Sequence, residues 1–304
     1  MESQRDSIAD AFEVFIGNAL KGEHGQFFTP RNVIRFILKY LDKNFISINS
    51  NIKIMDPACG TGGFIVEALD FVWKKINISN KNELQKKEEQ LNFAQTKIYG
   101  IDKDKFVAKV TKAYMCILGD GTSNVMNKDS LQSLEEHYDT VDLLLTNPPF
   151  GKKIKIKNNE ILNNYSLKSN GSKGTNPEVL FIELSVKLLK ENGIMVIVVP
   201  EGIIGNYNDK YIRKFLNNNG KIISIVSLPI ETFKPHTGIK SSIIIFQKYK
   251  IFKDYNTVLI DIKKIGNDKN GKTLYKINDF GEPLKDKEGH FIVDDEMDNF
   301  YNII

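Results

Sequence analysis

The segment Val141-Asp142-Leu143-Leu144-Leu145-Thr146-Asn147-Pro148-Pro149-Phe150 joins a short apolar run to two consecutive prolines. Such a run is typical of a buried parallel strand. Proline cannot donate to a sheet ladder, so the two prolines end the strand and leave a rigid turn at its carboxyl edge. Open α/β sheets bind their ligands at that edge. The segment therefore predicts a parallel sheet and a site where this strand ends.

The turn offers two hydrogen-bond acceptors and an aromatic ring. The acceptors are the side-chain oxygen of Asn147 and the backbone carbonyl of Pro148, and the ring is that of Phe150. Together they suit a planar aromatic amine, which has two N–H bonds and a face on which a ring can stack. Asn147-Pro148-Pro149-Phe150 resembles the catalytic tetrapeptide of methyltransferases that modify exocyclic amino groups, above all that of adenine in DNA. The alternative is a proline-rich strand exit without chemistry.

A glycine-rich loop, Asp56-Pro57-Ala58-Cys59-Gly60-Thr61-Gly62-Gly63-Phe64, follows a short apolar strand and opens a helical pattern. Glycines at such a turn let the backbone approach a ligand, and the first N–H groups of the helix face it. The dinucleotide fingerprint fails because its third glycine position is Ile65. The loop resembles the S-adenosylmethionine loop of adenine-specific DNA methyltransferases, especially modification subunits of type I restriction systems. The resemblance implies cofactor binding by Asp56, Ala58, Cys59, Gly60, Thr61 and Gly62; the alternative is an ordinary connector.

Three further segments lie where this resemblance requires them. Gly25 to Pro30 resembles the family's cofactor-carboxylate segment, with Gln26, Phe27, Phe28 and Thr29 as its binding residues. Thr29 also fits a helix N-cap before Pro30, and both interpretations can hold. Asp102 ends the second predicted strand, where a carboxylate can accept ribose hydroxyls. Asp129 and Ser130 could bond the adenine amine of the cofactor, although a simple loop acid explains Asp129 equally well.

The order of these motifs resembles the gamma arrangement of amino-methyltransferases over roughly residues 22 to 250. Strand and helix patterns alternate along the same stretch. We therefore expect an α/β fold with a doubly wound, mostly parallel seven-stranded sheet, as in S-adenosylmethionine-dependent methyltransferases. We expect three parts: an N-terminal helical segment at 1–45, a catalytic domain at 46–250, and a peripheral hairpin and tail at 251–304.

An aromatic residue between the last two predicted strands completes the expected site. Related enzymes use such a residue to sandwich the target base against the aromatic of the Asn-Pro-Pro motif, and Phe233 is the candidate, with His236 in reserve. Phe233 also fits a plain core position. The base must leave its duplex, because its amine is otherwise paired and stacked.

Three polar segments have simpler interpretations. Gly151 to Thr175 is rich in Lys, Asn, Ser and Gly, which predicts a mobile active-site loop or a disordered stretch. Lys81 to Gln90 predicts a solvated helical face. Gly266 to Thr273 satisfies G-x-x-x-x-G-K-[ST], yet no helical pattern follows, as a phosphate loop would require. Asn270-Gly271 instead predicts a hairpin between Val258–Ile265 and Leu274–Ile277.

Composition adds few constraints. The chain has 304 residues, 42 basic against 38 acidic residues and a net charge of +4, too mild a balance to indicate nucleic-acid binding by itself. Cys59 and Cys116 have no disulfide or metal spacing, which predicts a reducing cytoplasmic location. The histidines show no ligand spacing, so we expect no metal, and no apolar run predicts a membrane span.

We expect methyl transfer from S-adenosylmethionine to N6 of adenine in DNA, with Asn147, Pro148, Pro149 and Phe150 as catalytic residues. Two alternatives stay open: the same chemistry on RNA or protein glutamine, and an idle scaffold that binds DNA and partners. No target-recognition region follows Tyr249, and the tail carries acids that repel phosphate. We therefore expect a fragment or a subunit that binds DNA weakly by itself. Its expected partners are DNA, a specificity subunit and a restriction subunit.

Overall fold

The computed structural model describes residues 29–119, 124–151, 154–169, 174–235, 237–250, 254–286, 289 and 291–300. Its centre is one sheet with the strand order β3-β2-β1-β4-β5-β7-β6-β8. The strands are β1 (Ile54–Asp56), β2 (Ile98–Asp102), β3 (Asn124–Asn127), β4 (Val141–Thr146), β5 (Leu189–Pro200), β6 (Gly220–Ser227), β7 (Ser241–Lys248) and β8 (Val258–Asp261).

The expected doubly wound, mostly parallel sheet is confirmed. β7 alone among these strands runs antiparallel to its neighbours, β5 and β6. The sheet differs from the expected one by an eighth strand, because β8 pairs in parallel with β6. β8 lies beyond residue 250, so the sheet continues into the part of the chain expected to be peripheral. In β8, Ile260 packs into the core while Leu259 is 74% exposed, as fits a short edge strand.

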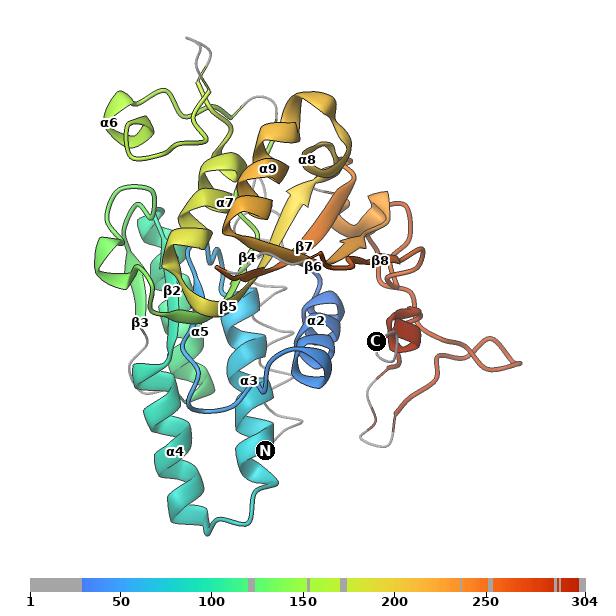
Figure 1. The fold of residues 1–304 in the computed structure, drawn as a ribbon. Helices are drawn as coiled ribbons and strands as arrows, with labels where there is room; N and C mark the ends of the chain where they lie inside the picture. Colours follow the sequence, from blue (N-terminus) through green and yellow to red (C-terminus); the bar gives the residue numbers. More distant parts are fainter. Residues whose placement is uncertain are drawn as a thin grey trace.

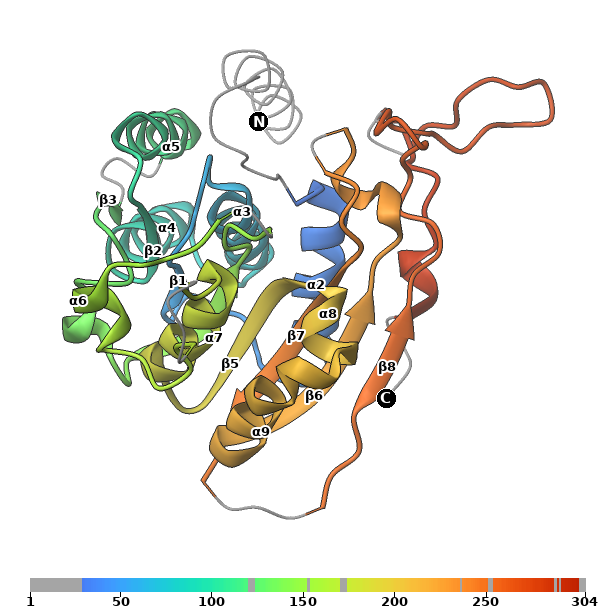
Figure 2. The ribbon, with the colours of Figure 1, turned by 90° about the horizontal axis from the view of Figure 1, so that it is seen from above.

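Helices cover both faces of the sheet (Figure 1; seen from above in Figure 2). One face carries α2 (Arg31–Asn44), α3 (Gly63–Asn77), α4 (Glu83–Thr96) and α5 (Lys105–Leu118). The other carries α6 (Asn159–Leu162), α7 (Pro177–Leu188), α8 (Glu201–Gly205) and α9 (Lys210–Asn219). Short 3₁₀ turns lie at η1 (Glu135–His137), η2 (Tyr207–Asp209), η3 (Ile230–Phe233) and η4 (Met297–Phe300). No helix in the described part of the chain is long and apolar enough to cross a bilayer.

The central strands are mostly apolar because successive side chains enter opposite cores. Ile54 packs with the α2–α5 layer, and its neighbour Met55 packs with the α6–α9 layer. Leu143 and Leu144 divide between the same two cores. Burial on both faces explains why these strands show no polar alternation in the sequence.

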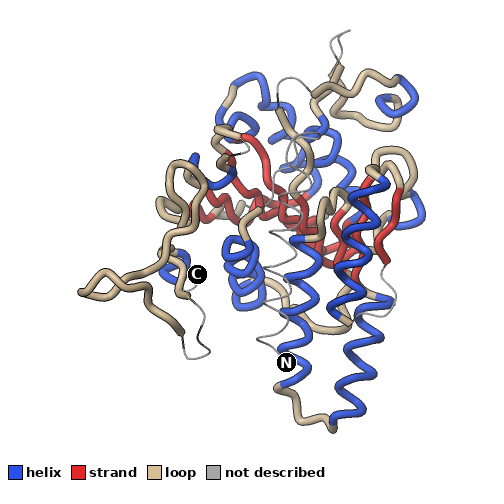
Figure 3. Tube along the Cα trace, turned by 180° about the vertical axis from the view of Figure 1, so that it is seen from behind, coloured by secondary structure: helices blue, strands red, loops and turns tan. Residues whose placement is uncertain are grey.

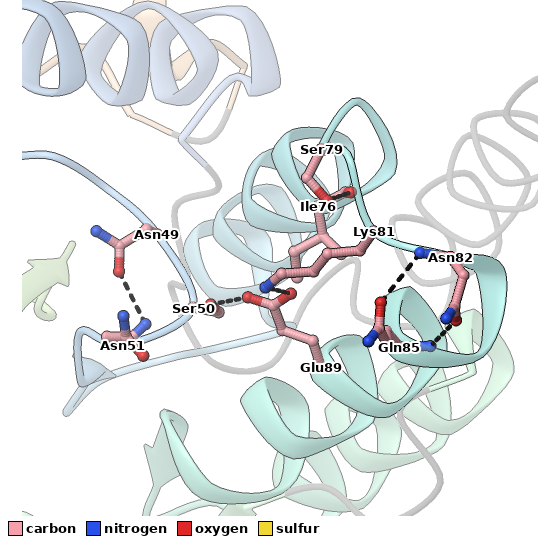
Figure 4. A network of polar contacts seen from close by, with 9 residues as sticks. All are labelled: Asn49, Ser50, Asn51, Ile76, Ser79, Lys81, Asn82, Gln85 and Glu89. Atoms are coloured by element: carbon pink, nitrogen blue, oxygen red, sulfur yellow. Dashed lines mark hydrogen bonds and ion pairs between the residues drawn. The ribbon is translucent and has the colours of Figure 1, made fainter.

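The charged segment before β2 forms the outer part of a helical pair with α3. Asn82 caps the start of α4 with a capping box. The Asn82 side chain accepts from the Gln85 N–H, and the Gln85 side chain accepts from the Asn82 N–H. Beside this cap, Glu89 accepts hydrogen bonds from Ser50 and Lys81 (Figure 4). The polar side chains of α4 stay at the surface, which confirms the prediction of a solvated helical face.

The polar stretch after Phe150 is more ordered than its composition suggested. Ile156 and Thr175 pair as an antiparallel bridge, and Ile161, Leu162, Tyr165 and Leu167 are buried against α7 and its surroundings. Glu183 on α7 accepts the N–H groups of Ser166 and Leu167. The expectation of a wholly mobile or disordered stretch is therefore wrong for its described part, since a few scattered apolar residues suffice to anchor it.

Residues 262–300, here called the C-terminal arm, extend beyond β8 (Figure 3). Isolated bridges join Asn267 to Thr273, Ile277 to Pro283, and Lys285 to Phe291. The first bridge confirms the predicted turn around Asn270-Gly271. The hairpin is shorter than expected, because Tyr275 pairs with Val293 and not with the strand before the turn.

The acidic tail of the arm docks on the core. Asp294 pairs with the Lys264 amine at 2.5 Å, and Asp295 Oδ2 accepts from the Asn32 side chain at 3.0 Å. Glu296 accepts the backbone N–H of Lys264. Asp295 thus joins the arm to α2, while Asp294 and Glu296 make contacts within the arm.

Candidate functional site

The glycine loop and the Asn-Pro-Pro-Phe turn lie side by side, because β1 and β4 are parallel neighbours. Met55 is in register with Leu144, so both strands end at the same edge. The Thr146 hydroxyl donates to Asp56 Oδ1 at 2.7 Å, and both residues are buried. This hydrogen bond ties the residue before Asn147 to the first residue of the glycine loop. The structure therefore brings together the two motifs that the sequence separates by about ninety residues.

The glycine loop is held by backbone contacts to the neighbouring elements. The Cys59 N–H donates to the Ile101 carbonyl at 2.9 Å, and the Gly62 N–H donates to the Cys59 carbonyl at 2.8 Å. Gly62 has φ +92°, and a Cβ there would lie 2.7 Å from Thr111 Cγ2. The Thr111 hydroxyl donates to the Gly60 carbonyl at 2.6 Å. Thr111 is fully buried on α5; the sequence analysis missed it, and a threonine on an apolar helix face was its only signal.

Cys59 lies beneath the loop and is a packing residue. A Cβ at Gly100 would lie 3.2 Å from its sulfur, so the thiol is wedged against β2. Burial raises the pKa of the Cys59 thiol well above its usual range, and the charges of Asp56 and Asp102 raise it further. The thiol therefore stays protonated and is not a nucleophile. Ala58 and Thr61, which the sequence also assigns to the loop, are half-buried.

Two carboxyl groups lie under the loop. Burial raises the pKa of Asp56 to about 7, although hydrogen bonds from Thr146 and the Ala58 N–H oppose the effect. Asp102 ends β2 as predicted; its Oδ2 accepts the Gly60 N–H at 3.0 Å and its Oδ1 accepts the Asp104 N–H at 2.8 Å. Burial raises the pKa of Asp102 too. The expected ribose-binding acid is thus also a support of the loop.

Asp129 and Ser130 follow β3 at the same edge. Ser130 is buried, and its hydroxyl donates to the Pro57 carbonyl at 2.6 Å, so it anchors the glycine loop. Asp129 is half-buried and accepts the Leu131 N–H at 3.1 Å through Oδ1. Asp129 is therefore the better placed of the two for a ligand contact.

Asn147 meets the start of α2. Its side-chain Nδ2 donates to the Thr29 hydroxyl at 3.2 Å, across 118 positions of sequence. Thr29 is not the N-cap of α2 that the sequence also allowed: the helix begins at Arg31 and Pro30 occupies the cap position without a side-chain bond. The reason is local, since Pro30 has an extended ψ of 137°. Gln26, Phe27 and Phe28 lie outside the described residues.

A buried ion cluster sets the position of α2 relative to α3. Glu67 on α3 is 2% exposed and binds the guanidinium groups of Arg31 and Arg35, the latter at 2.7 Å. Because Arg31 starts α2, this cluster also places Thr29 beside Asn147. The sequence carries no signal for this cluster, since nothing in a helical pattern pairs residues more than thirty positions apart.

The two candidate stacking residues are in contact. The rings of Phe150 and Phe233 lie 6.2 Å apart between centroids at 80°, edge to face, and both are buried. A base sandwiched between two rings needs parallel faces roughly 7 Å apart, and the edge-to-face rings of this structure do not form such a sandwich. His236, the reserve candidate, lies outside the described residues. Within the described residues no group of three or more His, Cys, Asp or Glu could hold a metal ion.

Comparison with known proteins identifies the fold and the family of this chain. The type I restriction enzyme EcoEI methylase subunit of Escherichia coli is 31% identical over 253 residues, covering 81% of this chain and 47% of that subunit. Among solved structures, a Listeria monocytogenes protein assigned to the class I S-adenosylmethionine-dependent methyltransferases has a TM-score of 0.67 at 22% identity, covering 86% of this chain and 72% of that one. The EcoKI M protein has a TM-score of 0.59 at 21% identity, and the match covers 80% of this chain and 49% of that one.

The structural likenesses establish the fold, which is that of S-adenosylmethionine-dependent methyltransferases. The chain spans about half the length of the curated relatives it matches. The family model described as N-6 DNA methylase matches residues 3–298, nearly the whole chain. This protein therefore belongs to the N-6 DNA methylase family.

Proposed function

We propose that this chain transfers a methyl group from S-adenosylmethionine to the exocyclic N6 of adenine in DNA, as the catalytic part of a restriction-modification system. The observation that carries the proposal is the placement of Asn147 beside both the glycine loop and Thr29. The Asn147 side-chain oxygen, an acceptor for an amine, thus lies at the edge of the sheet where the glycine loop begins.

The residues around the loop fit the expected cofactor. A Cβ at Gly60, where φ is +53°, would meet no atom within 4 Å, so open space lies over the loop at this position. The first N–H groups of α3 have no intrahelical acceptor, and no side chain caps the helix at Gly62. Asp102, at the end of β2, suits a ligand with hydroxyl groups. We assign the ribose hydroxyls to Asp102 and the cofactor's adenine amine to Asp129.

The target amine is a poor nucleophile, because its lone pair is conjugated with the purine ring. The Asn147 side-chain oxygen and the Pro148 carbonyl would accept its two N–H bonds, which favours a pyramidal nitrogen with a localised lone pair. When bound, S-adenosylmethionine supplies an electrophilic methyl group that leaves sulfur for this nitrogen, and the amine releases one proton. The protein contributes orientation and preorganised acceptors. Phe150 and Phe233 would hold the flipped base by stacking.

Asn147→Ala tests the proposal. It removes one acceptor from the site and leaves the glycine loop intact, so methyl transfer should fall by at least roughly a hundredfold. The dissociation constant for S-adenosylmethionine, measured by calorimetry, should change little. Tritium transfer to unmethylated genomic DNA, an RNA pool and a protein extract, assayed side by side, measures both activity and substrate class.

The matched control is Asn219→Ala. It removes the hydrogen bond from the Asn219 side chain to the Phe215 carbonyl in α9, an element that carries none of the expected site residues. It should transfer methyl groups at the wild-type rate. Near-normal turnover by Asn147→Ala would refute the assignment. Methyl transfer to RNA or protein but not to DNA would show that DNA is not the substrate. Wild-type protein that binds no cofactor would indicate a non-catalytic scaffold that binds DNA and partners.

We propose further that a specificity subunit supplies sequence recognition, that a restriction subunit completes the system, and that the protein works in the cytoplasm. In the described part of the C-terminal arm, Asp295 binds Asn32 of α2, and Asp294 pairs with Lys264 within the arm. The net charge of the whole chain is only +4. Purified chain should therefore bind DNA weakly, with affinity that falls steeply with salt. A single well-defined methylated site after treatment of genomic DNA with the chain alone would contradict this.

A further inference from the structure

The segment with the phosphate-loop pattern touches the loop that carries Phe233. Gly271 in the turn of the C-terminal arm has φ +85°, and a Cβ there would lie 2.2 Å from the Lys234 carbonyl oxygen and 2.9 Å from the Pro235 nitrogen. These are backbone atoms, which cannot move aside as the end of a side chain can. Gly271 thus brings its backbone directly against the residue that follows Phe233.

The turn that makes this contact is rigid. The Gly271 N–H donates to the Asp268 carbonyl at 3.0 Å, and Asp268 Oδ1 accepts the N–H groups of Asn270 and Lys272, each at 2.8 Å. One side chain therefore holds the turn from within. Below the turn, Gly266 is also fixed, since a Cβ there would lie 2.1 Å from Val293 Cγ1.

The ring of Phe233 is buried against Phe150, but the backbone hydrogen bonds next to Phe233 are short-range. They include the Lys234 N–H to the Glu231 carbonyl, at 3.1 Å, and the Thr237 N–H to the Phe233 carbonyl, at 3.0 Å. Both join residues only three or four positions apart. The contact with Gly271 is a long-range support from another part of the chain.

We infer that the turn Asp268–Lys272 acts as a buttress for the Phe233 loop, and that Gly271 is a positioning residue for the base-stacking ring. The inference rests on the proposed function only for the role of Phe233. The Phe233 ring must turn for a base to fit between it and Phe150, and its backbone must stay in place for the ring to return to one position. A turn held against the backbone of the next residue keeps that backbone in place.

The chain supplies its own matched control. A second turn of the arm repeats the same local structure: the Gly281 N–H donates to the Asn278 carbonyl at 3.0 Å, and Asn278 Oδ1 accepts the N–H groups of Phe280 and Glu282. Gly281 has φ +81°, but a Cβ there would meet no atom within 4 Å. Alanine strains both turns alike and collides with the Phe233 loop only at Gly271.

The experiment compares Gly271→Ala with Gly281→Ala in the full chain. Hydrogen exchange of peptides covering residues 228–241 should be faster by roughly tenfold in Gly271→Ala and unchanged in Gly281→Ala. Methyl transfer to unmethylated genomic DNA should show kcat lower by roughly tenfold to a hundredfold in Gly271→Ala. The dissociation constant for S-adenosylmethionine should stay within about twofold of wild type in both variants, because neither residue touches the glycine loop.

Each result decides one part. Equal exchange in the two variants would overturn the buttress. An exchange difference with equal kcat would overturn the positioning role. If wild-type protein transfers no methyl to DNA while the exchange difference persists, the proposed function fails and the buttress stands. Should Gly271→Ala not fold, the milder pair Asp268→Ala and Asn278→Ala, which removes the acceptor inside each turn, must give the same contrast.

Discussion

Asp56→Asn should make the protein's stability less sensitive to pH. The carboxyl of Asp56 is 1% exposed and has a pKa of about 7 in place of an ordinary 3.8, chiefly because burial disfavours its charge. Asparagine is nearly the same size and keeps an oxygen for the Ala58 N–H and the Thr146 hydroxyl. The substitution therefore removes the ionisation and preserves both hydrogen bonds.

The magnitude follows from linkage. A folded-state pKa above the unfolded one means that the folded protein holds a proton that the unfolded chain releases. The stabilisation is fully present below about pH 4 and is lost as pH rises through about 7. Each pH unit of this interval is worth about 1.4 kcal/mol, so ionising Asp56 lowers the unfolding free energy by about 4 kcal/mol. The variant should match wild type near pH 4 and exceed it by up to that amount near pH 8.

Urea unfolding at half-unit steps from pH 4 to 8 measures this difference, and the other carboxyl groups cancel when the two proteins are compared. Thr146→Val provides a second test, because it removes a hydrogen bond that lowers the pKa of Asp56. The loss of stability should still begin near pH 4, but it should extend to higher pH and become larger. A stability difference between wild type and Asp56→Asn that stays constant across the range would show that Asp56 is not held protonated by burial.

Two further predictions concern the framework of the site. Gly62→Ala should destabilise the fold by more than the roughly 1 to 2 kcal/mol of left-handed strain, because its Cβ would collide with Thr111, whereas Gly60→Ala should cost the strain alone. Equal melting temperatures for the two variants would contradict this. Glu67→Gln should cost about 2 to 3 kcal/mol in urea unfolding, since it leaves two guanidinium groups facing a neutral amide. Glu83→Gln is the control, because Glu83 is exposed in its ion pair with Lys86, and it should cost under roughly 1 kcal/mol. A similar cost for Glu67→Gln and Glu83→Gln would refute the role of burial.

Sequence patterns predict the structure correctly where local rules decide the outcome. The prolines after Thr146 and the glycines after Asp56 mark strand ends whatever surrounds them, and Asn270-Gly271 makes its turn from local bonds. The interpretation failed where sparse contacts over long distances decide. The stretch after Phe150 is anchored by four apolar side chains among many polar ones, and β8 joins the sheet because the edge of β6 accepts it.

The sequence alone determined the doubly wound fold, the two central motifs and their common edge, because hydrophobic period, proline and glycine act within a few residues. How the site is held depends on the tertiary structure. Asn147 meets Thr29 because buried Glu67 binds the start of α2. Asp102, expected to bind the ribose, also supports the glycine loop, and Gly271 meets the Phe233 loop. These contacts join residues from 36 to 118 positions apart. They arise from packing, for which a single sequence carries no local signal.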